Sequence, residues 1–203
     1  MDIINEITRS HRELHESGET KTLVLTRRYD AGTEDVWDAC TNAERISRWM
    51  LPITGDLRLG GNYQLKDNAG GEILHCERPS LLKVTWAYGP GPASEVEVRL
   101  TAEDGGTLFE LRHTAVPPPD MWSQFGPGAV GIGWDLALLG LSMHLTGGMI
   151  PDHDRMHETE EGRQFITESS QAWGEAFLAA GATAEHAAAA TKATTAFYAP
   201  TPE

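Results

Sequence analysis

Two pairs of histidines have a spacing that suits metal coordination. His11 and His15 are four residues apart, as are His153 and His157, so either pair would share one face of a helix. In zinc proteases a glutamate directly follows the first histidine, but Arg12 stands at that position here. The second pair follows a proline among acidic residues, a pattern that the start of a helix also favours. Because a catalytic zinc ion needs three protein ligands and neither pair has an evident third, we expect no metal and no cofactor.

Two other histidines fall where a strand would turn them inward. His113 has the parity of Phe109 and Leu111, and His75 has the parity of Ile73. A buried histidine usually makes a local hydrogen bond. The alternative is a polar contact to a ligand, which is a common way to orient a small molecule in an apolar cavity. The sequence leaves both interpretations open.

Residues 129–145 form a helix that is apolar nearly all round, so it must be covered on more than one side. Its polar residues Asp135 and Ser142 are seven apart and therefore lie on one side. Because burying an unpaired carboxylate is costly, we expect them to face a solvent-filled groove and not the core. The helix also contains glycines, whose presence predicts a close approach to the C-terminal tail or to a ligand: Gly131, Gly133 and Gly140.

Several aromatic residues could line a pocket or simply fill the core. As pocket lining they would provide rigid apolar area with a few polar groups. These residues are Tyr63, Trp86, Trp122, Phe125 and Trp134. No nucleophile–base–acid order, glycine-rich phosphate loop or cysteine–histidine pair stands out.

Composition narrows the class of protein. The chain has 203 residues and a formal net charge of −14, which disfavours nucleic acid and anionic membrane surfaces as partners. Its two cysteines, Cys40 and Cys76, lie outside any C-x-x-C motif, so a disulfide framework or a thiolate zinc site is not expected. The N-terminus shows no basic flank with an apolar signal core. We therefore expect a cytoplasmic protein.

The elements that must position these residues follow from periodicity and from helix caps. Residues 22–29 form a strand, helices follow after Thr33 and over 43–49, and residues 55–114 alternate as an antiparallel meander. In the tail, one helix face is predicted from the spacing of Ile166, Ser170, Trp173 and Phe177. The predicted organisation is an amphipathic helix in 1–20 (residues 3–16), a domain in 21–149 with a loop around Trp122, and a helical extension packed on it in 150–203.

This order of elements resembles the helix-grip, START-like (SRPBCC) superfamily, and within it the bacterial homologues of the Hsp90 ATPase activator. The resemblance spans residues 22–147. The residues that carry it are Arg27-Arg28-Tyr29-Asp30-Ala31, Val36-Trp37-Asp38-Ala39-Cys40-Thr41, Arg48-Trp49, Leu57-Arg58-Leu59-Gly60-Gly61-Asn62-Tyr63, Leu82-Lys83-Val84-Thr85-Trp86 and Gly133-Trp134. It implies an α+β fold in which a curved antiparallel sheet surrounds a long C-terminal helix, with a cavity between them.

Three hypotheses of function follow, in order of preference. The first is non-catalytic binding of a small hydrophobic or amphipathic ligand between the sheet and the long helix. Its predicted site residues are Tyr63, Trp86, His113, Trp122, Phe125, Trp134 and Leu138. The second is a protein-interaction module, co-chaperone-like or self-associating as a homodimer. The third is a cyclase- or hydrolase-like enzyme that uses His113 or Asp135 as a general acid or base.

Overall fold

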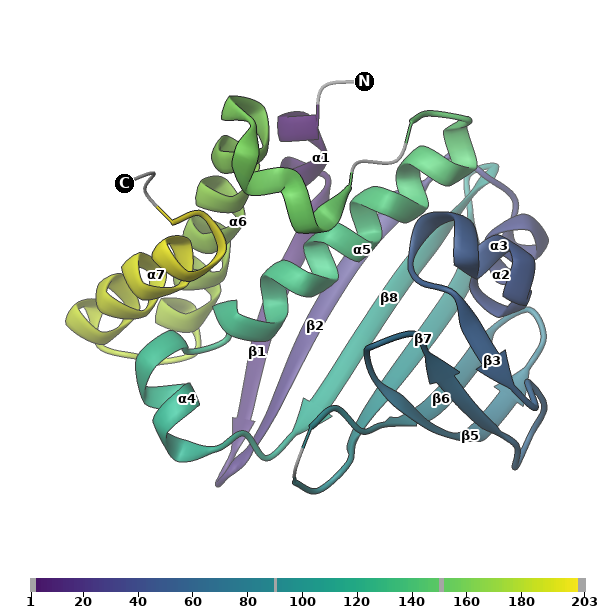
Figure 1. The fold of residues 1–203 in the computed structure, drawn as a ribbon, viewed down its shortest axis with the longest axis horizontal. Coiled ribbons are helices and arrows are strands. Elements are labelled where there is room, and N and C mark those ends of the chain that lie inside the picture. The colour runs from purple at the N-terminus through teal and green to yellow at the C-terminus, as the bar shows by residue number, and fades with distance from the viewer. Residues whose placement is uncertain (1–2, 90, 150–151, 201–203) are drawn as a thin grey trace.

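A computed structural model describes residues 3–89, 91–149 and 152–200, and one curved antiparallel sheet dominates it (Figure 1). In spatial order its eight strands are β1 (Ser10–Ser17), β2 (Thr20–Tyr29), β8 (Gly106–Ala115), β7 (Ser94–Glu103), β6 (Leu81–Trp86), β5 (Gly70–Glu77), β4 (Asn62–Leu65) and β3 (Ile53–Gly55). Each strand from β3 to β7 pairs with the next along the chain, which confirms the meander. Strand β2 then closes against β8.

The helices cover the inner face and the two ends of this sheet. In chain order they are α1 (Ile3–Thr8), α2 (Thr33–Thr41), α3 (Ala43–Trp49), α4 (Pro119–Phe125), α5 (Gly128–Thr146), the 3-10 turn η1 (His153–Glu158), α6 (Glu160–Ala179) and α7 (Ala184–Tyr198). Helix α5 crosses the concave side of the sheet, α2 and α3 lie at one end of it, and α6 and α7 lie beyond β1 at the other (Figure 1). This is the predicted grip of a sheet on a long helix.

The N-terminal segment differs from the prediction. Only Ile3–Thr8 is helical, whereas Ser10–Ser17, predicted as helix, is strand β1. A tight turn at Gly18, with φ of 60°, lets the segment form a continuous ladder with β2, and these hydrogen bonds outweigh its helical spacing. His11 and His15 consequently stand on a strand, both exposed and each 3.1 Å from a carboxylate oxygen of Glu13.

Smaller differences concern the connections. The segment around Trp122, predicted as a loop, is helix α4, and α2 begins one residue early with Gly32 in the cap position that Thr33 was expected to take. Thr183 caps α7 as predicted, accepting a hydrogen bond from the backbone of His186. Pro151 and the side chains of His153 and Asp154 fall outside the described part of the chain.

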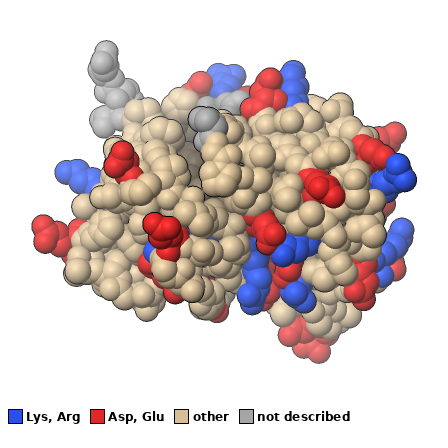
Figure 2. All heavy atoms as spheres, turned by 90° about the horizontal axis from the view of Figure 1, so that it is seen from below, with Lys and Arg blue, Asp and Glu red and all other residues tan. Residues whose placement is uncertain are grey.

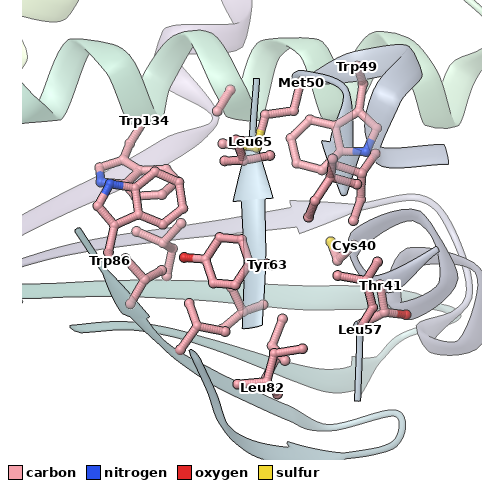
Figure 3. Close-up of a pocket in the computed structure, with 18 of the residues that line it drawn as sticks. Cys40, Thr41, Trp49, Met50, Leu57, Tyr63, Leu65, Leu82, Trp86 and Trp134 are labelled. Atoms are coloured by element: carbon pink, nitrogen blue, oxygen red, sulfur yellow. The ribbon is translucent and has the colours of Figure 1, made fainter. Parts of the chain in front are cut away.

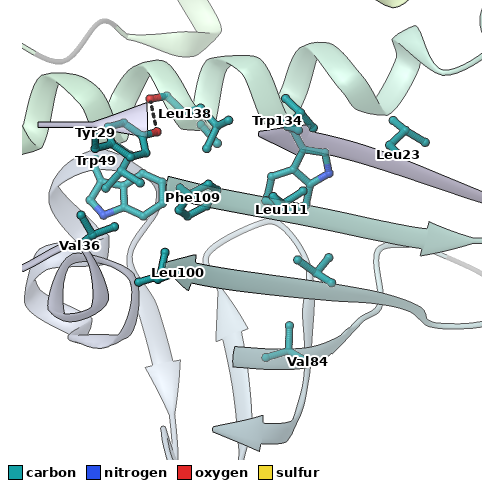
Figure 4. Close-up of a cluster of buried hydrophobic side chains, with 14 of the residues drawn as sticks. Leu23, Tyr29, Val36, Trp49, Val84, Leu100, Phe109, Leu111, Trp134 and Leu138 are labelled. Carbon is teal, nitrogen blue, oxygen red and sulfur yellow. Dashed lines mark hydrogen bonds between the residues drawn. The ribbon is translucent and has the colours of Figure 1, made fainter. Parts of the chain in front are cut away.

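Helix α5 separates two hydrophobic clusters. Leu138 packs toward the sheet (Figure 4), in a cluster that also contains Leu141. Ile132 and Leu139 belong to the second cluster, with residues of α1 and α6. By length and composition, Gly128–Thr146 is the one helix of the described chain that could cross a membrane, but most of it is buried inside the protein, as in the core helix of a soluble fold.

The outer face of the sheet is polar. Lys83 pairs with Glu95 at 2.7 Å, and Arg112 pairs with Glu110 at 2.7 Å. Seen from below, acidic and basic side chains lie next to each other and do not form a field of one sign (Figure 2). Exposed pairs of this kind contribute little to stability. The apolar cavity described below lies on the opposite, inner face.

Candidate functional site

A cavity of about 140 Å³ lies between the inner face of the sheet and α5, and Figure 3 shows most of its lining. The period of two along β6, β7 and β8 turns alternate side chains toward it, and α5 contributes residues spaced by three and four. The lining consists of Cys40, Thr41, Ile46, Trp49, Met50, Ile53, Leu57, Tyr63, Leu65, Ile73, Cys76, Leu82, Val84, Trp86, Val96, Val98, Phe109, Leu111, Trp134, Ala137 and Leu138.

One end of the cavity is aromatic. The ring centroids of Trp86 and Trp134 are 5.0 Å apart, and those of Tyr63 and Trp86 are 6.4 Å apart. The Tyr63 hydroxyl donates a hydrogen bond to the carbonyl of Thr85 at 2.7 Å. Because Trp134 also donates its ring N–H to His113, these two polar groups are already used within the protein, and the rings present apolar surface to the cavity.

His113 supports this aromatic end from behind and does not line the cavity. Its Nδ1 accepts a hydrogen bond of 3.0 Å from Trp134 Nε1, so the proton is on Nε2, which donates to Ser94 Oγ at 2.7 Å. Ser94 in turn donates to the carbonyl of Trp86 at 2.9 Å. Burial lowers the pKa of His113 to about 4, so the ring is neutral at neutral pH. Of the two interpretations of this histidine, the local hydrogen bond is correct.

A β-bulge in β5 determines which residues of that strand reach the cavity. Ile73 pairs with Val84 but His75 pairs with Lys83, so the register shifts by one residue between them. His75, predicted to face inward, is therefore turned outward, with a side chain that is 50% exposed. Cys76 takes the inward position instead.

Both cysteines of the chain line the cavity, which sequence analysis did not foresee. Cys40 comes from α2, where it precedes the cavity-lining Thr41, and Cys76 comes from β5. Burial raises the pKa of Cys40 to about 12. The apolar stripe of α2 could have indicated Cys40 as an inward residue, but only knowledge of the bulge could have indicated Cys76.

Asp135 and Ser142 were expected to face a solvent-filled groove, but both are buried. Arg12 on β1 donates to both oxygens of Asp135, at 2.9 and 3.1 Å, and Ser169 and Trp173 of α6 donate to the same carboxylate. The prediction failed because it assumed that the carboxylate had no partner. Neither Asp135 nor His113 reaches the cavity, so the acid–base roles considered for them have no position from which to act on its contents.

Ser142 belongs to a second buried cluster, where it donates to Glu6 of α1 and accepts from Arg27 of β2. Burial raises the pKa of Glu6, but hydrogen bonds from Ser142 and Arg27 lower it further, so that it ends below its usual value. The polar clusters around Asp135 and around Ser142 bind α5 to β1, β2, α1 and α6. No charged residue of α5 lines the cavity.

Four of the seven predicted ligand-binding residues line the cavity, namely Tyr63, Trp86, Trp134 and Leu138. Besides His113, the two that do not are Trp122 and Phe125, which pack against the tail helices. The Trp122 ring lies 5.6 Å from that of Phe177, and the Phe125 ring lies 5.5 Å from that of Phe197. That any of the seven binds a ligand stays a prediction.

The chemistry of the lining limits what the cavity can hold. Among the described residues, none with an ionised side chain lines it. A charge placed there would lose its hydration without a partner, so the buried part of any occupant must be neutral. The volume is close to that of engineered apolar cavities of about 150 Å³, which stay dry and bind benzene.

A curved sheet that grips one long helix over an apolar cavity defines the helix-grip class. Residues 30–146, more than half of the chain, match the family model described as Activator of Hsp90 ATPase homolog 1-like protein. The chain therefore belongs to this family.

Solved structures agree with this assignment. The crystal structure of CalU16 from Micromonospora echinospora is 35% identical, with a TM-score of 0.65, over 82% of this chain and 96% of that one. Its solution structure matches with a TM-score of 0.71 over 85% and 97%. Protein MLL2253 from Mesorhizobium loti, at 21% identity and a TM-score of 0.55 over 62% of this chain and 97% of that one, shows the shared fold alone. No functionally curated protein matches the chain significantly.

Proposed function

We propose that the protein binds a small, neutral hydrophobic molecule, or the apolar part of an amphipathic one, in the cavity between the sheet and α5. The observation that carries this proposal is the uncharged cavity of about 140 Å³, walled by Trp86, Trp134 and Leu138 among others. Protein interiors pack as densely as organic crystals, so side chains would normally fill an internal space of this size. A volume that an aromatic ring fits therefore favours a ligand.

Affinity should depend on the apolar bulk of the ligand. Each added methylene that fits should strengthen binding by about 0.8 kcal/mol, or roughly fourfold in Kd. A series of toluene, ethylbenzene and propylbenzene tests this relation, up to the length at which the cavity is full. Benzylamine, whose shape is close to that of ethylbenzene but which carries a positive charge, should bind far more weakly.

Filling the cavity from the protein side should abolish binding. Ala137 is buried on the cavity side of α5, so Ala137→Leu places additional carbon atoms in the space that a ligand would occupy. We expect toluene to shift the methyl resonances of Leu138 and Val96 in the unmodified protein but not in this variant. Val130→Leu is the matched control, because Val130 lies on the same helix but is 43% exposed and outside the lining. Val98→Phe fills the cavity from the sheet if Ala137→Leu fails to fold.

Two results would contradict the proposal. The first is the absence of any saturable shift with the whole alkylbenzene series, and the second is unchanged binding in a folded Ala137→Leu protein. Thermal unfolding of each variant shows whether it is folded.

A further inference from the structure

The helix pair α2 and α3 is joined to α5 by a single hydrogen bond. Arg45 of α3 donates from Nε to Nε2 of His144, in the last turn of α5, at 3.1 Å. Among the described residues of these helices, no other hydrogen bond connects the pair to α5. Figure 1 shows the pair beside the C-terminal end of α5. The rest of this interface is held by side-chain packing.

Both partners of this bond belong to helices that bound the cavity. Ile46, which lines the cavity, directly follows Arg45, and Figure 3 shows Trp49 and Met50 at the end opposite the aromatic end. The lining residues that α3 and α5 contribute are Ile46, Trp49, Met50, Trp134, Ala137 and Leu138. A separation of α3 from α5 would therefore widen the cavity and admit water to its apolar contents.

The bond requires an uncharged imidazole. A guanidinium can only donate, so Nε2 of His144 must be the ring nitrogen that carries no proton. Two carboxylates of α2 fix the guanidinium from its other side: Nη1 of Arg45 donates to Asp35 at 2.7 Å and to Asp38 at 3.1 Å. Since arginine keeps its charge, the state of the contact depends on the histidine.

The charged groups that face His144 are Arg45 and Arg48 of α3 and Asp35 of α2. Burial, and after it the two guanidinium groups, lower the pKa of His144 below its usual value, while Asp35 opposes them. A proton on Nε2 would remove the acceptor and place a cation against Arg45. The free carbonyls at the C-terminal end of α5 attract a charged ring, so the protonated side chain would turn toward them and away from α3.

We propose that protonation of His144 weakens the attachment of α2 and α3 to α5 and thereby releases the ligand from the cavity. The inference rests on the proposed function and concerns the regulation of the same site. Because the attached state takes up a proton less readily than a free histidine, acidification below about pH 6.5 shifts the protein toward the loosened state. A ligand in that state is exposed to water and loses affinity.

The experiment measures the Kd of toluene at about pH 7.5 and about pH 5, from the methyl resonances of Leu138 and Val96. We expect the Kd to rise by about fivefold at the lower pH, the factor that corresponds to one hydrogen bond of ordinary net strength. His113 does not interfere, because its pKa of about 4 keeps most of the folded protein neutral at this position at both pH values.

Two variants separate His144 from other titrating groups. His144→Gln keeps an acceptor for Arg45 but takes up no proton, so its Kd should be the same at both pH values. His186→Gln is the matched control, because His186 is also half-buried but lies in α7, where Nε2 is 2.9 Å from the carbonyl oxygen of Ser123. This variant should keep the pH dependence of the unmodified protein.

A second measurement needs no variant. Binding linkage is reciprocal, so saturating toluene should lower the proton affinity of His144 by the same factor of about five. An NMR titration of the His144 ring with and without toluene measures this change.

Three outcomes would overturn the inference: a Kd that does not change with pH, an equal change in His144→Gln, or a proton affinity of His144 that toluene leaves unaltered. In each case the proposed function survives, because toluene still binds at neutral pH. If toluene does not bind at neutral pH, the proposed function fails and the inference fails with it, so the two failures are distinguishable.

Discussion

At the scale of single residues, the buried polar side chains of α5, Asp135 and Ser142, are each hydrogen-bonded to residues from a distant part of the chain. Asp135 is neutralised by Arg12, and Ser142 joins Glu6 to Arg27. Breaking such a buried pair by removing one member leaves an uncompensated charge. These contacts hold α5 in place, and they explain why none of these residues is available to the cavity.

His113 makes stability depend on pH in a defined window. The unfolded chain protonates this histidine near pH 6.5, whereas the folded protein, in which burial lowers the pKa, does so only at about 4. Between these values the unfolded state binds more protons, so the free energy of unfolding should fall as the pH is lowered, by roughly 3 kcal/mol in total.

Urea unfolding between about pH 7 and about pH 4.5 measures this loss. His113→Gln keeps a group that can accept from Trp134 and donate to Ser94 but does not titrate, so the variant should lack this part of the pH dependence. Parallel curves for the two proteins would show that His113 is not the source.

At the scale of elements, α5 lacks a continuous polar, solvent-exposed face because the sheet covers one side of it and α1 and α6 cover another. Its glycines show how close those contacts are. A Cβ at Gly131 would lie 2.3 Å from the Trp173 ring of α6, whereas a Cβ at Gly133 would meet nothing within 4 Å. The prediction that the glycines allow a close approach is thus confirmed for Gly131, and its partner is the tail.

These two glycines form a matched pair for mutagenesis. Gly131→Ala should destabilise the protein by roughly 1 to 3 kcal/mol, because the Trp173 ring cannot move aside without strain. Gly133→Ala should stabilise it by roughly 0.5 to 1 kcal/mol, because alanine loses less backbone entropy in a helix. Urea denaturation of both variants measures the difference, and equal effects would show that the contact with Trp173 is not limiting.

At the scale of the whole molecule, the segments on either side of the family domain complete its core. Strand β1 extends the sheet, and α6 buries Phe165 in the cluster on the far side of α5 and Trp173 in the cluster that α5 shares with the sheet. The predicted boundaries at residues 20 and 149 therefore deserve a direct test. Self-association, chaperone contact and a cytoplasmic location stay predictions.

A chain that ends at residue 149 exposes the far side of α5. Ile132 and Leu139, which are almost fully buried, would then face water, and Asp135 would lose Ser169 and Trp173 as donors. We expect the shortened protein to lose its cooperative thermal transition and to aggregate on size-exclusion chromatography. A cooperative transition together with unchanged toluene binding would instead show that the chain folds autonomously without residues 150–203.

The sequence by itself determined the elements whose signals are local. Alternation in Val96, Val98 and Leu100 predicted β7, Thr183 predicted the start of α7, and the spacing of Trp173 and Phe177 predicted a buried helix face. The family motifs added the grip of the sheet on α5. Tyr63, Trp86, Trp134 and Leu138 were placed at the cavity on the same grounds.

Only the tertiary structure decided the features that depend on pairing between distant segments. Ser10–Ser17 forms a strand because its backbone pairs with that of β2. Asp135 can be buried because this strand places Arg12 next to it. A single bulge exchanged His75 for Cys76 at the cavity. The physical reason is the same in each case: a side chain's environment is set by its neighbours in space, and one residue of register reverses the face of a strand.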